Sequence, residues 1–335
     1  MKKPSMLVLL LLIAIASLFS ALLFGRYPVS LSEVVQVFLE QLNFGPYDLS
    51  VTTRTVVLDV RLPRVVAAML IGSALSVAGA AYQGLLKNPL VSPDILGAST
   101  GAGFGAALAL IMSWSLVWVQ LSAFLFGILA VILVYQISRL IRQSDPILTL
   151  VLTGLLIGTI FSSLISVMKY VADPFDKLPS ITYWLMGSLS TTSMGDVKFA
   201  VFPVVFGMIP LILLRWKLNV MSFGEEEAMA LGVNTKGIRF VVIFCATLMT
   251  AAVVSISGII GWVGLLIPHF VRSLVGPDFR LLLPGSILVG GTYLVWVDTF
   301  SRTLLPLEIP LGILTSLVGA PFFLYLLVNS RRGWQ

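Results

Sequence analysis

Charge is what this sequence lacks most. Asp, Glu, Lys and Arg make up only 11% of its 335 residues, whereas 58% are hydrophobic. An ordinary soluble domain has roughly 25% charged residues. A chain with so few charges cannot cover a water-facing surface. The composition therefore excludes a soluble globular protein and predicts a single membrane-embedded domain over residues 1–335.

Histidine and cysteine are nearly absent, with one residue of each. A His- or Cys-rich metal site is therefore excluded, and Cys245 cannot form an intramolecular disulfide. The sequence also lacks the G-x-x-x-x-G-K-[ST] loop that binds ATP and the H-E-x-x-H motif of metalloproteases. We expect a non-enzymatic protein with no cofactor in this chain, and an intramembrane enzyme has little support.

Long uncharged runs are what the sequence has instead. Residues 4–25, 95–138 and 240–271 contain no Asp, Glu, Lys or Arg. A bilayer is crossed by about 20 apolar residues in a helix, so the second of these runs holds two spans. The pattern predicts an all-α integral membrane protein with about ten transmembrane helices, and the Ser-, Thr- and Gly-rich stretch 178–195 as irregular or half-inserted. The expected spans are 5–24, 63–85, 95–112, 116–138, 147–169, 196–215, 238–258, 261–273, 281–302 and 309–329.

The net charge of +6 indicates topology. With the N-terminus in the cytoplasm, basic residues fall mostly on the cytoplasmic side, as the positive-inside rule requires. We therefore expect a multi-pass membrane protein with both termini cytoplasmic. A nucleic-acid partner has little support. Residues 27–60 become the longest extracytoplasmic loop, in which Ser30 and Glu33 form a capping box that opens a short helix through Leu42. Residues 216–237 become the longest cytoplasmic loop.

Glycines recur every four residues at Gly97, Gly101 and Gly105, and again at Gly154 and Gly158. Such faces let helix backbones approach closely. Packing within one bundle is the favoured interpretation, and a subunit interface is the alternative.

Two cytoplasmic segments are candidate functional sites. In the first, the glutamates from Glu225 onward suit a helix N-terminus and Gly232 suits a left-handed cap. This short helix, about 221–233, either docks on a partner or is a solvated connection. In the second, Lys87 to Asp94 contains two prolines that prevent helix continuation. This hairpin is either a gate or a plain turn.

Three arginines on the extracytoplasmic side, Arg61, Arg64 and Arg302, run against the charge bias. A guanidinium group suits carboxylates, so the arginines suggest an acidic protein partner or an anionic substrate. Snorkelling to lipid phosphates is the alternative. Asp298 lies four residues before Arg302, and a structural ion pair between the two is favoured.

The chain resembles the FecCD-like permeases of the vitamin B12 and iron-siderophore class of ABC importers, also called type II importers. The resemblance rests on the order and spacing of several short segments, each weak alone. They are Arg61-Leu62-Pro63-Arg64, Gly79 to Gln83, Asn88-Pro89-Leu90, Gly97 to Ala102, Trp184 to Ser188, Gly224-Glu225 with Ala230-Leu231-Gly232, Gly264 to His269, Leu283-Pro284-Gly285, and Leu311-Gly312 with Gly319-Ala320-Pro321.

The resemblance implies a ten-helix subunit of a bacterial or archaeal inner membrane. This subunit dimerises, with a second copy or a paralogue, around a translocation pathway. Two cytoplasmic ATPase subunits, which bind the ATP and Mg²⁺, would dock on a coupling helix that includes Gly224, Glu225, Ala230, Leu231 and Gly232. An extracytoplasmic binding protein would present glutamates to Arg61, Arg64 and Arg302. The cytoplasmic gate would involve Asn88, Leu90, Gln143 and Ser144.

The substrate implied by the resemblance is a metal chelate, with iron(III)-siderophore first and haem, cobalamin or molybdate as alternatives. The rival function is an ion-coupled secondary transporter. Such proteins carry ion sites near the membrane midplane, but Asp298 is the only carboxylate that the predicted spans place in the membrane interior.

Overall fold

A computed structural model describes residues 3–45, 47–141 and 146–329, and these ranges contain helices and no strand. The helices, with η1 a π-helix and η2 a 3₁₀-helix, are α1 (Lys3–Leu23), α2 (Leu31–Gln41), α3 (Val51–Thr55), η1 (Val56–Arg61), α4 (Leu62–Leu85), η2 (Pro93–Leu96), α5 (Ala98–Ile111), α6 (Leu116–Leu140), α7 (Pro146–Val171), α8 (Lys177–Met186), α9 (Met194–Leu213), α10 (Arg215–Phe223), α11 (Glu225–Ala230), α12 (Thr235–Ser257), α13 (Val263–Val275), α14 (Phe279–Thr303) and α15 (Leu311–Asn329).

The predicted all-α membrane architecture is confirmed. Over the described ranges, seven helical spans are long and apolar enough to cross a bilayer, and three shorter apolar helices (α5, α13 and α15) accompany them. These ten elements coincide with the ten expected spans. The predicted capping box is also present: the Ser30 hydroxyl accepts a hydrogen bond from the Glu33 backbone, and Glu33 accepts one from the Ser30 backbone.

The largest difference from the predicted boundaries concerns the second span, which begins at Val51 and not at residue 63. The helical segments α3, η1 and α4 follow one another without a break to Leu85. The Ser50 side chain caps the start by accepting a hydrogen bond from Thr53 N. The wider π turn ends at Arg61, and Pro63, in the first turn of α4, has no N–H and so leaves one fewer ladder bond to make. The expected loop 27–60 is therefore helical over its last ten residues.

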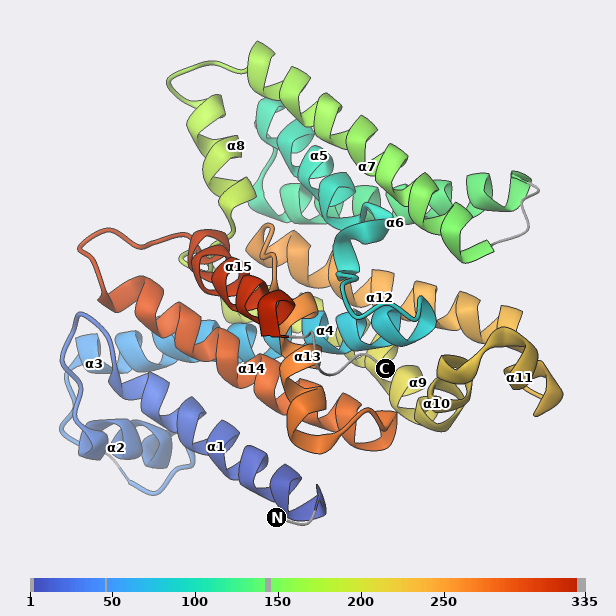
Figure 1. The fold of residues 1–335 in the computed structure, drawn as a ribbon. Coiled ribbons are helices and arrows are strands. Elements are labelled where there is room, and N and C mark those ends of the chain that lie inside the picture. Colours follow the sequence, from blue (N-terminus) through green and yellow to red (C-terminus); the bar gives the residue numbers. More distant parts are fainter. Residues whose placement is uncertain (1–2, 46, 142–145, 330–335) are drawn as a thin grey trace.

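Helix α4 lies at the centre of the bundle and packs against α9, α12, α13 and α14 (Figure 1). Glycines permit these crossings. A Cβ atom at Gly72 would collide with the backbone of Gly290 on α14, and one at Gly79 would collide with Gly264 on α13. Backbones that approach so closely gain van der Waals contact, which drives helix association in lipid.

The glycine repeat of α5 serves packing within this chain. A Cβ atom at Gly101 would lie 2.5 Å from the carbonyl oxygen of Phe126 on α6, and one at Gly105 would lie 2.5 Å from that of Ser122. Gly154 on α7 faces the backbone of Ile95 in the same manner. These three glycines therefore follow the favoured interpretation of bundle packing.

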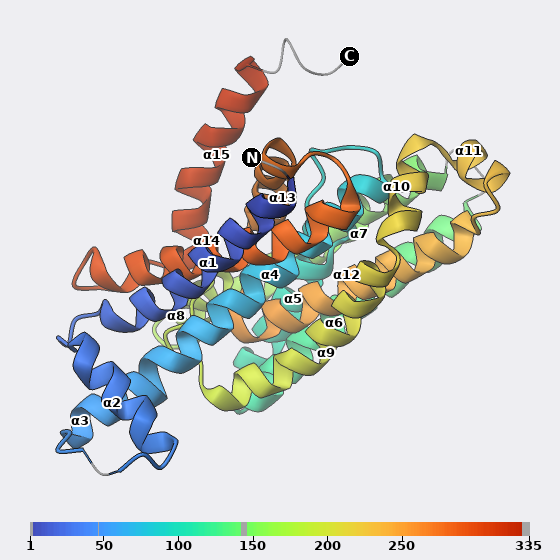
Figure 2. The ribbon, with the colours of Figure 1, turned by 90° about the horizontal axis from the view of Figure 1, so that it is seen from below.

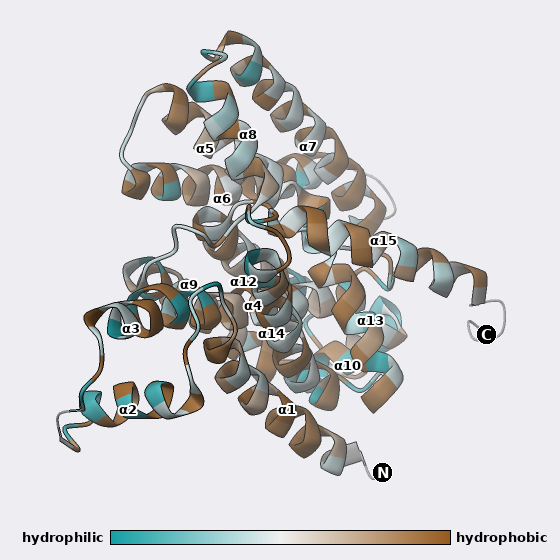
Figure 3. Ribbon diagram, turned by 90° about the vertical axis from the view of Figure 1, so that its left-hand side faces the viewer, coloured by the Kyte–Doolittle hydropathy of each residue, from teal (hydrophilic) through white to brown (hydrophobic). Residues whose placement is uncertain are grey.

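The bundle has two distinct ends, which we call the α2 end and the α11 end. Figure 2 shows α2 and α3 at one end, and α10, α11 and the start of α1 at the other. Helix α1 is mostly hydrophobic along its length, whereas α2 carries hydrophilic positions (Figure 3). The stretch 178–195, predicted as irregular or half-inserted, is helical as far as Met186 and irregular only from residue 187 to residue 193.

Candidate functional site

The three arginines of the α2 end are buried, with 2%, 4% and 6% of Arg61, Arg64 and Arg302 exposed. Two of them cap the C-terminus of α1, whose last carbonyl groups have no partner within the helix. A cation at this position also matches the negative end of the helix dipole. Arg61 donates to the carbonyl oxygens of Leu22 (2.7 Å), Leu23 (3.1 Å) and Tyr27, and Arg302 donates to those of Ala21 and Phe24 (both 2.6 Å).

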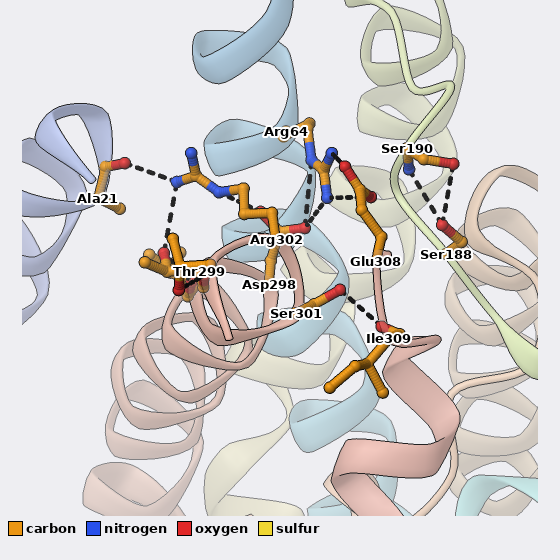
Figure 4. Close-up of polar contacts among 12 residues, drawn as sticks. Ala21, Arg64, Ser188, Ser190, Asp298, Thr299, Ser301, Arg302, Glu308 and Ile309 are labelled. Carbon is orange, nitrogen blue, oxygen red and sulfur yellow. Dashed lines mark hydrogen bonds and ion pairs between the residues drawn. The ribbon is translucent and has the colours of Figure 1, made fainter. Parts of the chain in front are cut away.

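The third arginine, Arg64, joins α4 to two acidic residues (Figure 4). Its Nη2 lies 2.8 Å from Asp298 Oδ1 on α14, and its guanidinium group makes a two-pronged pair with Glu308 at 2.9 and 3.1 Å. The predicted pair of Asp298 and Arg302 is present, with Arg302 Nε 3.4 Å from Asp298 Oδ2. Asp298 thus bridges two arginines, and the closer one, Arg64, was not predicted as its partner.

Glu308 was missed by the sequence reasoning. It lies in the irregular segment between α14 and α15, 244 residues from Arg64, and no local spacing points to the contact. Its side chain is 26% exposed, so it is the member of the cluster that reaches the surface. The role of Arg61, Arg64 and Arg302 in docking a partner stays a prediction, because in this chain alone their donors bind the chain's own oxygens.

The candidate coupling segment at the α11 end consists of two helices. The expected single helix 221–233 is interrupted at Gly224, where the backbone has a φ of 156°. Glu225 opens the second helix and pairs with Arg239 of α12. Gly232 follows the last turn with a φ of 75°, which is the predicted left-handed cap.

This segment presents apolar side chains to its surroundings. Phe223, Met229 and Leu231 are 76%, 56% and 63% exposed, whereas Ala228 between them is fully buried. The buried alanine fixes the helix on the bundle and leaves the larger residues outward. An apolar cluster beside three glutamates, at the end of a membrane bundle, is typical of a surface that binds another protein.

The candidate gate is a tight turn between α4 and η2. The Asn88 side chain accepts a hydrogen bond from Leu90 N at 2.9 Å, and both residues are exposed. Asp94, which is partly buried, accepts a hydrogen bond from the Ser99 hydroxyl, and burial raises the pKa of its carboxyl group. Gln143 and Ser144, the other predicted gate residues, lie outside the described residues.

Three helix ends meet inside the bundle, at the end of α8, the end of α12 and the start of α15. Ser188 N donates to Ser257 O at 2.8 Å, and Leu311 N donates to Gly187 O at 2.8 Å. Gly187 and Gly258 have φ values of 75° and 70°, and a Cβ atom at Gly312 would lie 2.6 Å from Met186 O. Irregular backbone at membrane depth is tolerated where protein covers it or where it lines a water-filled cavity.

None of these sites holds a metal-binding cluster: over the described ranges no group of three or more His, Cys, Asp or Glu side chains comes together. The chemistry available is hydrogen bonding, ion pairing and apolar contact, which suits a conduit and docking surfaces.

Comparisons with known proteins agree with this architecture. The chain is 39% identical over 330 residues to the molybdate import system permease protein MolB of Haemophilus influenzae, covering 98% of this chain and 97% of that one. It is 38% identical to a probable iron chelatin transport system permease of Helicobacter pylori, covering 92% and 94%. Other relatives are named as cobalamin and hemin permeases.

The fold is also that of a known structure. A chain from an inward-facing structure, described as a metal-chelate type ABC transporter, superposes with a TM-score of 0.87 at 38% identity, covering 97% of this chain and 99% of that one. The model of the FecCD transport family matches residues 10–329. The chain therefore belongs to the FecCD transport family of ABC transporter permeases.

Proposed function

We propose that this chain forms the translocation pathway of an ATP-driven, binding-protein-dependent importer, as a dimer with a second copy or a paralogue. Two ABC ATPase subunits bind the ATP and Mg²⁺ on the cytoplasmic side. An extracytoplasmic binding protein delivers the substrate. The permease itself performs no covalent chemistry, and the direction of transport comes from coupling to ATP, because each nucleotide state favours a different exposure of the pathway.

The observation that carries this proposal is the exposed apolar cluster of Phe223, Met229 and Leu231 at the α11 end. A six-residue helix gains little stability alone and is here held by its contact with α10 and α12. Met229 and the adjoining Leu231 stay exposed beside those contacts. We assign Gly224, Glu225, Ala230, Leu231 and Gly232 to ATPase coupling. This assignment orients the α11 end toward the cytoplasm, and we expect both termini on that side of the membrane.

The α2 end is then extracytoplasmic and receives the binding protein. Arg61 and Arg302 support this surface by fixing the end of α1, while Arg64 offers the exchangeable contact. Its partner Glu308 is partly exposed, so a carboxylate of a docked protein can compete with Glu308 for the same guanidinium group. The docking assignment is consistent with the burial of the three arginines if Arg61 and Arg302 support the surface and Arg64 makes the contact.

Iron(III)-siderophore is the proposed substrate, with haem, cobalamin and molybdate as alternatives. The relatives named above are permeases for molybdate, iron chelatin, cobalamin and hemin, and they divide between these choices. The binding protein is expected to select among them, since the permease needs to bind its substrate only weakly.

The first experiment is a pull-down of the tagged chain from native membranes, with mass spectrometry of its partners. Recovery of an ABC ATPase and an extracytoplasmic binding protein in fixed ratio supports the importer, and the binding protein can then be screened for its ligand. Recovery of the chain alone under gentle detergent refutes the proposal and favours the ion-coupled transporter. An ion-coupled transporter would need a carboxylate that is available to bind an ion, and Asp298 is already paired with two arginines.

A further inference from the structure

A pocket opens between α6, α8, α9 and α12, beside the junction where α8 and α12 end. Its volume is about 220 Å³. Eight of its fifteen lining residues carry a hydroxyl group, Gln120 carries an amide and Asp196 carries the single charge; none of the fifteen is Lys or Arg. Residues 178–195, which supply most of these hydroxyl groups, are rich in Ser and Thr, and the proposed importer function involves none of these side chains.

Three hydroxyl groups of the pocket already donate their single proton to nearby backbone carbonyl oxygens. Ser255 donates to Ala252 O at 2.8 Å, and Ser257 donates to Val253 O at 2.8 Å. The Ser180 hydroxyl likewise donates to a backbone carbonyl of the preceding turn, at 2.9 Å. A hydroxyl group has one proton and two lone pairs. What these three side chains still offer to a ligand is therefore lone pairs only.

The two strongest polar groups of the pocket add further acceptors. Gln120 is 7% exposed and donates one N–H of Nε2 to Asp196 Oδ1 at 2.7 Å, which leaves its carbonyl oxygen as an acceptor beside its second N–H. Among the described residues, Asp196 Oδ2 accepts twice from Ser193, whereas Oδ1 accepts from Gln120. A carboxylate has about four acceptor positions, so one position on Oδ1 remains.

Within the described part of the chain, the buried hydroxyl group of Thr192 in this pocket has no hydrogen-bond partner. Thr192 is 8% exposed, and its Oγ1 makes no hydrogen bond. Leaving such a group unpaired costs free energy. A ligand in the pocket would satisfy it.

We propose that this pocket binds a small cation that carries N–H donors, a primary ammonium group. Acceptor oxygens surround it, the Asp196 carboxylate supplies the opposite charge, and the rings of Tyr183 and Trp184 in the wall suit a cation. The C-terminal end of α12, the negative end of its dipole, lies in the same wall at Ser257. Oxyanions are disfavoured by the same oxygens. The ammonium group comes either from a free amine or from the headgroup of phosphatidylethanolamine.

The test uses the purified full chain in phosphatidylcholine nanodiscs, titrated with ethylammonium chloride while the thermal unfolding midpoint is followed. A ligand that binds the folded state raises the midpoint in a saturable manner. Sodium molybdate and ethylene glycol, at matched ionic strength, serve as the anionic and neutral probes. We expect saturable stabilisation by ethylammonium and none by molybdate.

Two variants locate the site. Asp196→Asn keeps one oxygen, for the α9 cap, and removes the charge, and we expect ethylammonium to bind about tenfold more weakly. Thr192→Val removes only the unpartnered hydroxyl, and we expect a loss of about threefold with a folded protein. Ser163→Ala on the exposed face of α7 is the control, with unchanged binding. An unchanged response of Asp196→Asn, or the absence of saturable stabilisation by ethylammonium in every nanodisc, overturns the proposal.

A second set of nanodiscs distinguishes the sources. If phosphatidylethanolamine raises the midpoint of the wild-type chain, but not of Asp196→Asn, and removes the response to ethylammonium, the lipid headgroup is the ligand. If ethylammonium acts equally in both lipids, the ligand is a free amine. Either result supports an ammonium site. Stabilisation by molybdate in place of ethylammonium refutes it. None of these readouts depends on the ATPase or the binding protein, so the importer proposal stands or falls separately.

Discussion

Replacing Arg64 by methionine removes the central cation of the buried cluster at the α2 end. Arg64 is 4% exposed and holds both Asp298, which is 1% exposed, and Glu308. Removing one partner of a buried pair leaves an uncompensated charge and costs about 3–5 kcal/mol. Because Arg302 still lies 3.4 Å from Asp298, we expect the lower part of this range, about 3 kcal/mol.

The assay is unfolding of the detergent-solubilised chain by SDS, followed by tryptophan fluorescence. Arg54→Met is the matched control, because Arg54 makes an ion pair with Glu40 at 2.9 Å at the same end of the bundle but with side-chain exposures of 38% and 27%. Exposed pairs contribute about 0.2–1 kcal/mol.

A double variant completes this experiment. Adding Asp298→Asn to Arg64→Met removes the stranded charge, and we expect it to recover part of the loss. Equal effects of Arg64→Met and Arg54→Met, or no recovery in the double variant, would refute the reasoning that burial makes this cluster structural.

Three further predictions concern separate parts of the chain. Leu231→Asp puts a charge on the exposed apolar cluster and should detach the ATPase, measured by co-purification, while the chain remains folded; full ATP-driven uptake would count against the coupling assignment. Gly258→Ala places a Cβ atom against Trp184 O in a backbone with a φ of 70° and a ψ of −167°, so we expect a loss of at least about 1–3 kcal/mol from this positive-φ conformation alone, read in the SDS assay; an unchanged midpoint would show that the junction is loose. Gly25→Ala brings a Cβ atom within 2.6 Å of the Arg61 guanidinium group and should expose the end of α1 to faster amide hydrogen exchange at residues 21–24. Gly261→Ala, which meets no atom within 4 Å and has no positive φ, is the comparison at a loop glycine.

The sequence by itself determined that this protein lies in a membrane and that it has about ten spans. Eleven per cent of charged residues cannot cover a soluble surface, and uncharged runs of about 20 residues are long enough to cross a bilayer as helices. Local signals also placed the capping box at Ser30 and the left-handed cap at Gly232, because each depends on neighbours within a few residues.

Only the tertiary structure decided which polar groups meet. Arg64 finds Glu308 across 244 residues, and Ser188 meets Ser257 where two helices end together. The sequence marked Arg61 and Arg302 as unusual for the predicted side of the membrane. It could not distinguish an arginine that binds a partner from one that caps the end of α1. The second span also starts twelve residues early, because a π turn lets the helix continue into Pro63. Such choices depend on the packing of α1, α4 and α14, and no local pattern encodes that packing.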